Sequence, residues 1–218
     1  IQSLLLSPGF RPRSLPLRQA ETKATAAASN ELTSQTIIEE LNNFVGDDMI
    51  AVADVGDCLF SCVDLQVNRF VAPAFYASMG FGVPAGIGAM LADPTRRPVI
   101  LVGDGGFQMT GVEVSTARKL HQNPIVIVFD DGYYGTLRNI GPDLKSFELA
   151  RWEYAALARA LGCDGSPVMT PAELRNSLGV ALESKLPYVI DAKITGRPSQ
   201  FLQRVTELIS KKTRENPA

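Results

Sequence analysis

Short, uninterrupted apolar runs alternate along this chain with segments in which apolar residues recur at helical spacing. The runs predicted as strands are Met49–Ala53, Val71–Ala72, Pro98–Val102, Pro124–Phe129 and Tyr188–Ile194. Helices are predicted after a cap at Thr33 or Ser34 through about Val45, and at Ser78–Leu91, Gly111–Leu120, Arg151–Leu161, Pro171–Ser184 and Ser199–Lys211. Continuous apolar strands separated by helices indicate βαβ units. The sequence therefore predicts the α/β class, a three-layer sandwich whose mainly parallel sheet is covered by helices on both faces.

Size and charge narrow the possible partners. The chain has 218 residues, of which 45% are hydrophobic, and this is enough for one sizeable core. Its 21 Lys and Arg residues against 23 Asp and Glu residues give a net charge of −2, without the basic excess that nucleic-acid binding requires. The apolar runs are much shorter than the roughly 20 residues of a membrane-spanning helix. We therefore expect neither nucleic acid nor a membrane as a partner.

The cysteines and the first residues add two expectations. The three cysteines, Cys58, Cys62 and Cys163, form no C-x-x-C pair and are odd in number, which favours a reducing, cytoplasmic compartment over a disulfide framework. Residues 1–30 contain three prolines and then a small, polar tract. This composition predicts a poorly ordered, linker-like segment at 1–30, followed by one domain at 31–218.

Two aspartates end successive predicted strands. Asp104 lies in a Gly-Asp-Gly turn after one strand, and Asp131 follows the next. A helical crossover between parallel strands places both carboxylates at the same edge of the sheet. Neighbouring glycines allow backbone N–H groups to approach an anion, and paired carboxylates suit Mg²⁺, which commonly shares its ligands with substrate phosphates. The residues thus predict a metal–diphosphate site.

Each of these motifs also has a purely structural interpretation, which must be weighed against the functional one. Gly-Asp-Gly is common in ordinary turns, and the second acidic strand end is what favours a site. The glycines of Gly80–Gly88 superficially suggest a dinucleotide loop, but no strong strand precedes them, so close helix packing is the preferred interpretation. Cys58 has no histidine nearby in the sequence to activate it, and a packing role is preferred for its thiol.

The residues around the two aspartates resemble a known cofactor motif. Val102–Thr116 reads VGDGGFQMTGVEVST, and Pro124–Gly135 reads PIVIVFDDGYYG. Together they resemble the thiamine diphosphate motif, which opens with GDG and closes with Asn-Asn. The amino-acid sequence of these two segments is most similar to that of 2-oxo acid decarboxylases of the indolepyruvate, phenylpyruvate and pyruvate type, and next to that of acetolactate synthase-like enzymes. The resemblance covers roughly Leu32–Ile194.

The resemblance implies roles for particular residues. Asp104, Asp131 and the main-chain carbonyl of Tyr133 would bind Mg²⁺, while Gly105 and Gly106 would donate N–H groups to the diphosphate. The carbonyl of Ala77 would accept from the cofactor's 4′-amino group, and Met79 would hold its two rings in a V shape. The implied cofactor-binding set is Gly56, Asp57, Cys58, Ala77, Met79, Asp104, Gly105, Gly106, Tyr133, Tyr134 and Gly135.

The sequence departs from the family in three respects. Asp130-Asp131 replaces the usual Asn-Asn, which keeps the oxygen donors and adds negative charge. Leu137 stands where classical pyruvate decarboxylases carry a glutamate that handles protons, which favours a bulkier or aromatic 2-oxo acid, or a synthase-like reaction. The glutamate that activates the cofactor belongs to an N-terminal pyrimidine-binding domain, which these residues do not contain. The resemblance therefore implies no catalytic residue in this chain.

The leading functional hypothesis is the thiamine diphosphate- and Mg²⁺-binding domain of a 2-oxo acid decarboxylase. Its partner would be a pyrimidine-binding domain or subunit, in a dimer or tetramer, and the unaccompanied chain would be inactive. The linker-like start and the absence of an initial Met favour a fragment over one subunit of a split enzyme. The alternatives are an acetolactate synthase-like carboligase and a cofactor-binding half that has lost catalysis.

Overall fold

The computed structural model describes residues 30–73, 75–140, 144–195, 203–204 and 206–207. The predicted linker-like segment, apart from residue 30, and most of the predicted helix Ser199–Lys211 lie outside these ranges. Within the described ranges, no helix has both the length and the apolar character needed to cross a bilayer.

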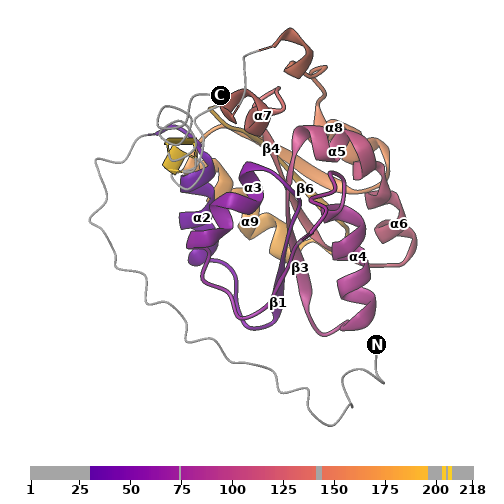
Figure 1. Ribbon diagram of the computed structural model, residues 1–218. Coiled ribbons are helices and arrows are strands. Elements are labelled where there is room, and N and C mark those ends of the chain that lie inside the picture. The colour runs from indigo at the N-terminus through magenta and orange to yellow at the C-terminus, as the bar shows by residue number, and fades with distance from the viewer. Residues whose placement is uncertain (1–29, 74, 141–143, 196–202, 205, 208–218) are drawn as a thin grey trace.

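A single parallel sheet organises the described chain (Figure 1). Its strand order is β2-β1-β3-β4-β6-β5, and each neighbouring pair runs parallel. The strands are β1 (Met49–Ala53), β2 (Phe70–Val71), β3 (Arg97–Gly103), β4 (Ile125–Asp130), β5 (Asp164–Val168) and β6 (Tyr188–Lys193). The predicted α/β class is therefore confirmed.

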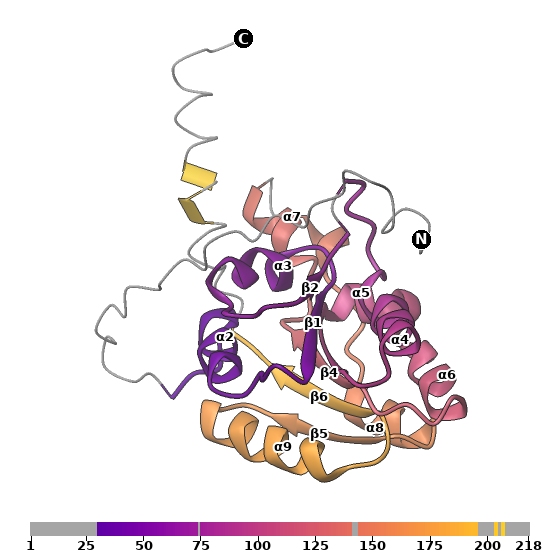
Figure 2. The same cartoon turned by 90° about the horizontal axis from the view of Figure 1, so that it is seen from below.

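Helices cover both faces of this sheet, as the view along it shows (Figure 2). On one face lie α2 (Ser34–Asn42), α3 (Asp57–Ser61) and α9 (Pro171–Glu183). On the other lie α4 (Gly82–Ala92), α5 (Asp104–Thr110), α6 (Val114–Lys119) and α8 (Tyr154–Ala160). A further short helix, α7 (Gly135–Ile140), follows β4, and single 3₁₀ turns occupy Cys62–Asp64, Gly111–Glu113 and Lys145–Phe147.

Alternation along the strands creates two apolar cores. Val99 and Leu101 of β3 pack with α2 and α9, whereas Ile100 and Val102 of the same strand pack with α4, α5 and α6. Successive side chains of a strand point to opposite faces, so a strand that is buried on both sides needs an unbroken apolar run. This is the physical reason why the central strands could be recognised in the sequence.

Several elements differ from the sequence-based expectation. A helix was expected from about Gly111, but α5 begins at Asp104, immediately at the end of β3, and a 3₁₀ turn separates it from α6. The helix expected from Ser78 begins at Gly82. Three short elements had no counterpart in the prediction, namely α3, α7 and β5.

The strand order also marks where a ligand is expected. From β1 the chain moves outward to β2, and then returns to place β3 on the other side of β1. In open α/β sheets, ligands bind beyond the carboxyl ends of the strands at such a reversal. The loops that follow β1 and β3 flank this position, and the loop that follows β4 lies next to them.

Candidate diphosphate and cation site

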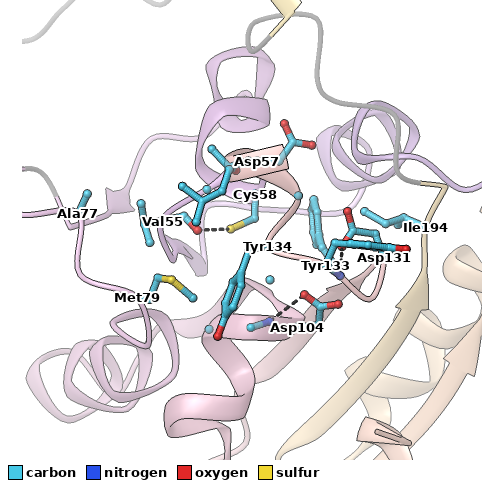
Figure 3. Close-up of a pocket in the computed structure, with 18 residues that line it drawn as sticks. Val55, Asp57, Cys58, Ala77, Met79, Asp104, Asp131, Tyr133, Tyr134 and Ile194 are labelled. Carbon is cyan, nitrogen blue, oxygen red and sulfur yellow. Dashed lines mark hydrogen bonds between the residues drawn. The ribbon is translucent and has the colours of Figure 1, made fainter. Parts of the chain in front are cut away.

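A pocket of about 250 Å³ opens at this reversal point (Figure 3). Its walls come from five segments that are distant in the sequence: the residues after β1, the stretch before α4, the junction of β3 with α5, the end of β4 with the residues that follow it, and the residue after β6. The lining residues are Val55, Gly56, Asp57, Cys58, Ala77, Met79, Gly103, Asp104, Gly105, Gly106, Phe129, Asp131, Tyr133, Tyr134, Gly135, Thr136, Leu137 and Ile194. Every residue of the predicted cofactor and metal sets is in this one pocket.

Asp104 is the first residue of α5 and is only 2% exposed. Its Oδ1 accepts from the N–H of Gly105 at 2.8 Å, and its Oδ2 accepts from the N–H of Gly132 at 2.6 Å. Burial, followed by the nearby carboxylate of Asp131, raises the pKa of Asp104 to about 7. The side chain is thus held by one N–H of α5 and one N–H of the loop after β4, in a place where its negative charge is unfavourable without a cation.

Asp131 faces the same pocket from the loop after β4. Its Oδ1 accepts from the N–H of Tyr133 at 3.0 Å, which closes a tight turn beside the cavity. Burial also raises the pKa of Asp131. Two partly desolvated carboxylates that repel each other are a donor set suited to a hard divalent cation, because bound Mg²⁺ offsets their charge.

The described residues contain no group of three or more His, Cys, Asp or Glu side chains arranged to hold a metal ion. The predicted set has only two carboxylates, with a backbone carbonyl as its third member. It is therefore compatible with this finding, and it leaves room for ligands from a phosphate group and from water.

The backbone of α5 is exposed to the pocket because Gly105 has no side chain. A Cβ there would lie 2.5 Å from the Tyr134 ring and 3.3 Å from Cε of Met79. These two side chains therefore converge on the first turn of the helix, and Figure 3 shows Tyr134 between Met79 and Asp104. Glycine at position 105 therefore allows Tyr134, from the loop after β4, and Met79, from the stretch before α4, to lie close to the backbone of α5.

A buried aspartate that the sequence analysis missed ties the first loop to α4. Asp54 is fully buried, and its carboxylate accepts from the N–H groups of Gly82 at 2.8 Å, Val55 at 2.7 Å and Gly80 at 3.2 Å. It thereby anchors the segment that carries Ala77 and Met79. A signal was present, because Asp54 follows directly after an apolar strand, as Asp104 does.

The neighbouring residues of the first loop are also held in place. The Ser34 hydroxyl donates to the carboxylate of Asp57, so α2 fixes this pocket side chain. The thiol of Cys58 donates to the carbonyl of Asp54 at 3.3 Å, and burial raises its pKa well above the usual value for cysteine. A protonated, buried thiol fits the packing role preferred for Cys58 over a nucleophilic one.

The pocket lining has a distinctive charge balance. It contains the carboxylates of Asp57, Asp104 and Asp131, and none of the described lining residues is Lys, Arg or His. The remaining side chains are mainly apolar, including Leu137 and Ile194. Leu137 was singled out by the sequence, whereas Ile194 follows β6 and had no local motif to identify it.

Comparison with known proteins places this geometry in context. Residues 54–192 match the family described as "Thiamine pyrophosphate enzyme, C-terminal TPP binding domain". The chain is 42% identical over 137 residues to "Indole-3-pyruvate decarboxylase" of Azospirillum brasilense, which covers 63% of this chain and 25% of that protein. It is 31% identical over 196 residues to "Putative acetolactate synthase large subunit IlvB2" of Mycobacterium tuberculosis, covering 85% and 35% of the two chains.

A solved structure shows the same fold. The thiamine diphosphate-dependent 4-hydroxybenzoylformate decarboxylase of Rhodococcus jostii RHA1 superposes with a TM-score of 0.73 at 22% identity, over 81% of this chain and 35% of that chain. The present chain thus spans between a quarter and about a third of the length of these similar proteins.

Proposed function

Because this chain belongs to the thiamine pyrophosphate enzymes, as their C-terminal TPP-binding domain, we propose that its pocket holds the diphosphate of the cofactor together with Mg²⁺. The observation that carries this proposal is the pairing of Asp104 and Asp131 in a pocket lined by no described basic side chain. A diphosphate cannot approach these carboxylates without a bridging cation, since like charges in a partly desolvated site repel strongly.

In this proposal, Asp104, Asp131 and the carbonyl of Tyr133 hold the cation. Gly105 and Gly106 present backbone to the diphosphate, and Gly56, Asp57 and Cys58 border its other side. The rigid hydrogen bonds that Asp104 accepts from two loops support its role, because they fix both oxygens before a ligand arrives. Tyr134 and Gly135 complete the wall beside the cation.

The rest of the cofactor would extend toward Ala77 and Met79. Met79 is close enough to Gly105 to pack under a ligand that crosses α5, and the backbone of Ala77 lies at the outer wall. Bound thiamine diphosphate supplies an ylid that adds to a 2-oxo acid carbonyl, and a thiazolium that accepts the electrons left by departing CO₂. The residues of this chain bind the cofactor, bend it and exclude water.

We further propose that a pyrimidine-binding domain or subunit completes the site, within a dimer or tetramer, and carries the activating glutamate. The pocket is smaller than the roughly 300–1,000 Å³ of typical ligand sites, as half of a shared site would be. Phe75 and Tyr76, next to Ala77, are 91% and 87% exposed. Apolar side chains so exposed beside a pocket suit an interface.

The complete enzyme, in this proposal, decarboxylates a 2-oxo acid with an apolar side chain in the cytoplasm. Leu137 and Ile194 make this part of the wall apolar, and all three cysteines are free thiols, which fits a reducing compartment. Carboligation is the second candidate, and the similarity to a protein described as an acetolactate synthase large subunit favours it. Product analysis with pyruvate and arylpyruvates, separating aldehydes from acyloins, distinguishes the two reactions.

Calorimetry tests the binding proposal. The chain is titrated with thiamine diphosphate in the presence of Mg²⁺, with thiamine diphosphate in EDTA, and with thiamine and Mg²⁺. We expect heat of binding only in the first titration, because both the diphosphate and the cation are required. Equal binding of thiamine, binding that survives EDTA, or no binding with Mg²⁺ would each overturn the proposal.

A further inference from the structure

Asp130, the last residue of β4, lies next to the proposed cation ligand but does not line the pocket. Its side chain is almost completely buried. Asp130 therefore places a further negative charge next to Asp131, outside the pocket wall. A buried carboxylate of this kind needs a partner.

Lys193 supplies that partner from the neighbouring strand. The two residues are paired in the β4–β6 register, and Nζ of Lys193 lies 2.6 Å from Oδ2 of Asp130. The same ammonium lies 3.0 Å from Oδ2 of Asp191, which is fully buried. Lys193 thus bridges two buried carboxylates while its own side chain is only 26% exposed.

Arg151 approaches Asp130 from the segment before α8. Its guanidinium nitrogen lies 3.4 Å from Oδ1 of Asp130. It also lies directly against Gly132, where a Cβ would be 2.1 Å from the guanidinium carbon, and Gly132 has a φ of +76°. The N–H of Gly132 donates to Asp104, so this residue sits between Arg151 and the proposed cation ligand.

We propose that Lys193 is a positioning residue for cation binding, because it holds Asp130 at the end of β4 and thereby fixes the loop Asp131–Tyr134. The inference rests on the proposed function of that pocket. Without Lys193, Asp130 would be a buried carboxylate with only the long contact to Arg151. The end of β4 would then rearrange, and with it Asp131 and the Gly132 hydrogen bond to Asp104.

A positioning role and a purely electrostatic role for Lys193 predict opposite changes in Mg²⁺ affinity when the lysine is removed. If Lys193 acted only through its charge, its removal would make the site more negative and Mg²⁺ would bind more tightly. If Lys193 positions the loop, Mg²⁺ binds more weakly. Loss of an outer partner of a metal ligand typically lowers metal affinity by about 10–100-fold.

The test is a mutant cycle on the 218-residue chain, in which both carboxylates that Lys193 contacts are neutralised. Mg²⁺ affinity is measured calorimetrically with thiamine diphosphate present, for the wild type, Lys193→Met, Lys193→Arg, the Asp130→Asn/Asp191→Asn variant and the triple variant that adds Lys193→Met to this pair. Lys119→Met, at an exposed position at the end of α6, is the control for loss of a lysine. Thermal unfolding of each variant is recorded alongside.

We expect Lys193→Met to lower Mg²⁺ affinity at least about tenfold, and Lys193→Arg and the control to remain near wild type. In the Asp130→Asn/Asp191→Asn background, Lys193→Met should change the affinity by no more than about twofold, since neither amide needs a counter-charge. If Lys193→Met does not fold, the triple variant must fold and bind like Asp130→Asn/Asp191→Asn.

Unchanged or tighter binding by Lys193→Met would overturn the positioning role, as would an equal loss in both backgrounds. A triple variant that fails to fold, while Asp130→Asn/Asp191→Asn folds, would overturn it too. A wild-type chain that binds no Mg²⁺ with thiamine diphosphate would instead refute the proposed function of the pocket itself, so the two failures are distinguishable.

Discussion

Asp104 is proposed to bind a cation as a carboxylate, but its burial favours the protonated form. Its carboxyl has a pKa raised from 3.8 to about 7, so the folded chain retains a proton that the unfolded chain has lost between these values. A group of this kind contributes stability at low pH that is lost as the pH rises toward 7. The conflict is relieved when a cation occupies the pocket, which makes the pH dependence a readout of the site.

We therefore predict that the metal-free chain unfolds at a lower temperature at pH 8 than at pH 6, and that Asp104→Asn reduces this difference. Thermal unfolding in EDTA measures the effect. Greater stability of the metal-free wild type at pH 8 would contradict the prediction.

Asp131 allows a test that separates oxygen donation from charge. The thiamine diphosphate motif that this chain resembles has asparagine at this position. Because an amide keeps a donor oxygen, Asp131→Asn should retain cofactor binding with Mg²⁺. Asp131→Ala removes the donor and should weaken Mg²⁺ binding by at least about tenfold, the scale on which even outer-shell changes act. Calorimetry with thiamine diphosphate compares the two, and equal affinities for both variants would remove Asp131 from the ligand set.

Site residues that belong to a local sequence motif could be predicted from the sequence, and those without such a motif could not. Asp104, Gly105 and Gly106 belong to one short motif and Asp131 belongs to another, and all four residues line the pocket as expected. Ile194 and Lys193 could not be identified in this way, because strand register alone brings the end of β6 beside the end of β4. Sheet order is a property of the assembled fold.

At the scale of elements, apolar runs predicted the central strands and, within one residue, the edge strand β2, but they did not predict the other edge strand, β5. Only Val168 of β5 is buried, and its sequence, DGSPV, has no apolar run, so this edge strand exists through its pairing with β6. Two glycines disfavour a helix at α5, yet burial of Phe107 between the sheet and Tyr154 stabilises it. Tertiary packing decides both cases.

Helix α4 offers a matched pair of glycines that tests the close-packing interpretation of Gly80–Gly88. A Cβ at Gly86 would lie 2.2 Å from Cδ1 of Ile100, whereas a Cβ at Gly88 would meet nothing within 4 Å. Gly86→Ala should therefore destabilise the chain by about 1–3 kcal/mol through overpacking. Gly88→Ala should stabilise it by up to about 1 kcal/mol, because alanine favours helix.

Urea unfolding at equilibrium measures both variants under the same conditions. A Gly86→Ala variant as stable as Gly88→Ala would show that α4 can move away from β3 without cost, and that the small residues there have another purpose.

At the scale of the whole molecule, the described chain forms two apolar cores. In the proposed function it provides only part of a catalytic site. The pocket walls contribute binding and orientation, and the proposed activating glutamate belongs to a pyrimidine-binding domain. We predict that the purified chain alone produces no CO₂ from arylpyruvates above background, with thiamine diphosphate and Mg²⁺ present. Turnover by the unaccompanied chain, measured as released CO₂, would contradict the need for a partner.

The central claim is that Asp104, Asp131 and the carbonyl of Tyr133 hold a cation that binds a diphosphate. A crystal structure of the chain grown with thiamine diphosphate and Mg²⁺ tests it most directly. We predict a metal at about 2.1 Å from an oxygen of each of the three residues, in an octahedral arrangement completed by phosphate oxygens and water. A diphosphate bound in this pocket without a metal, or a metal bound away from Asp104 and Asp131, would contradict the account.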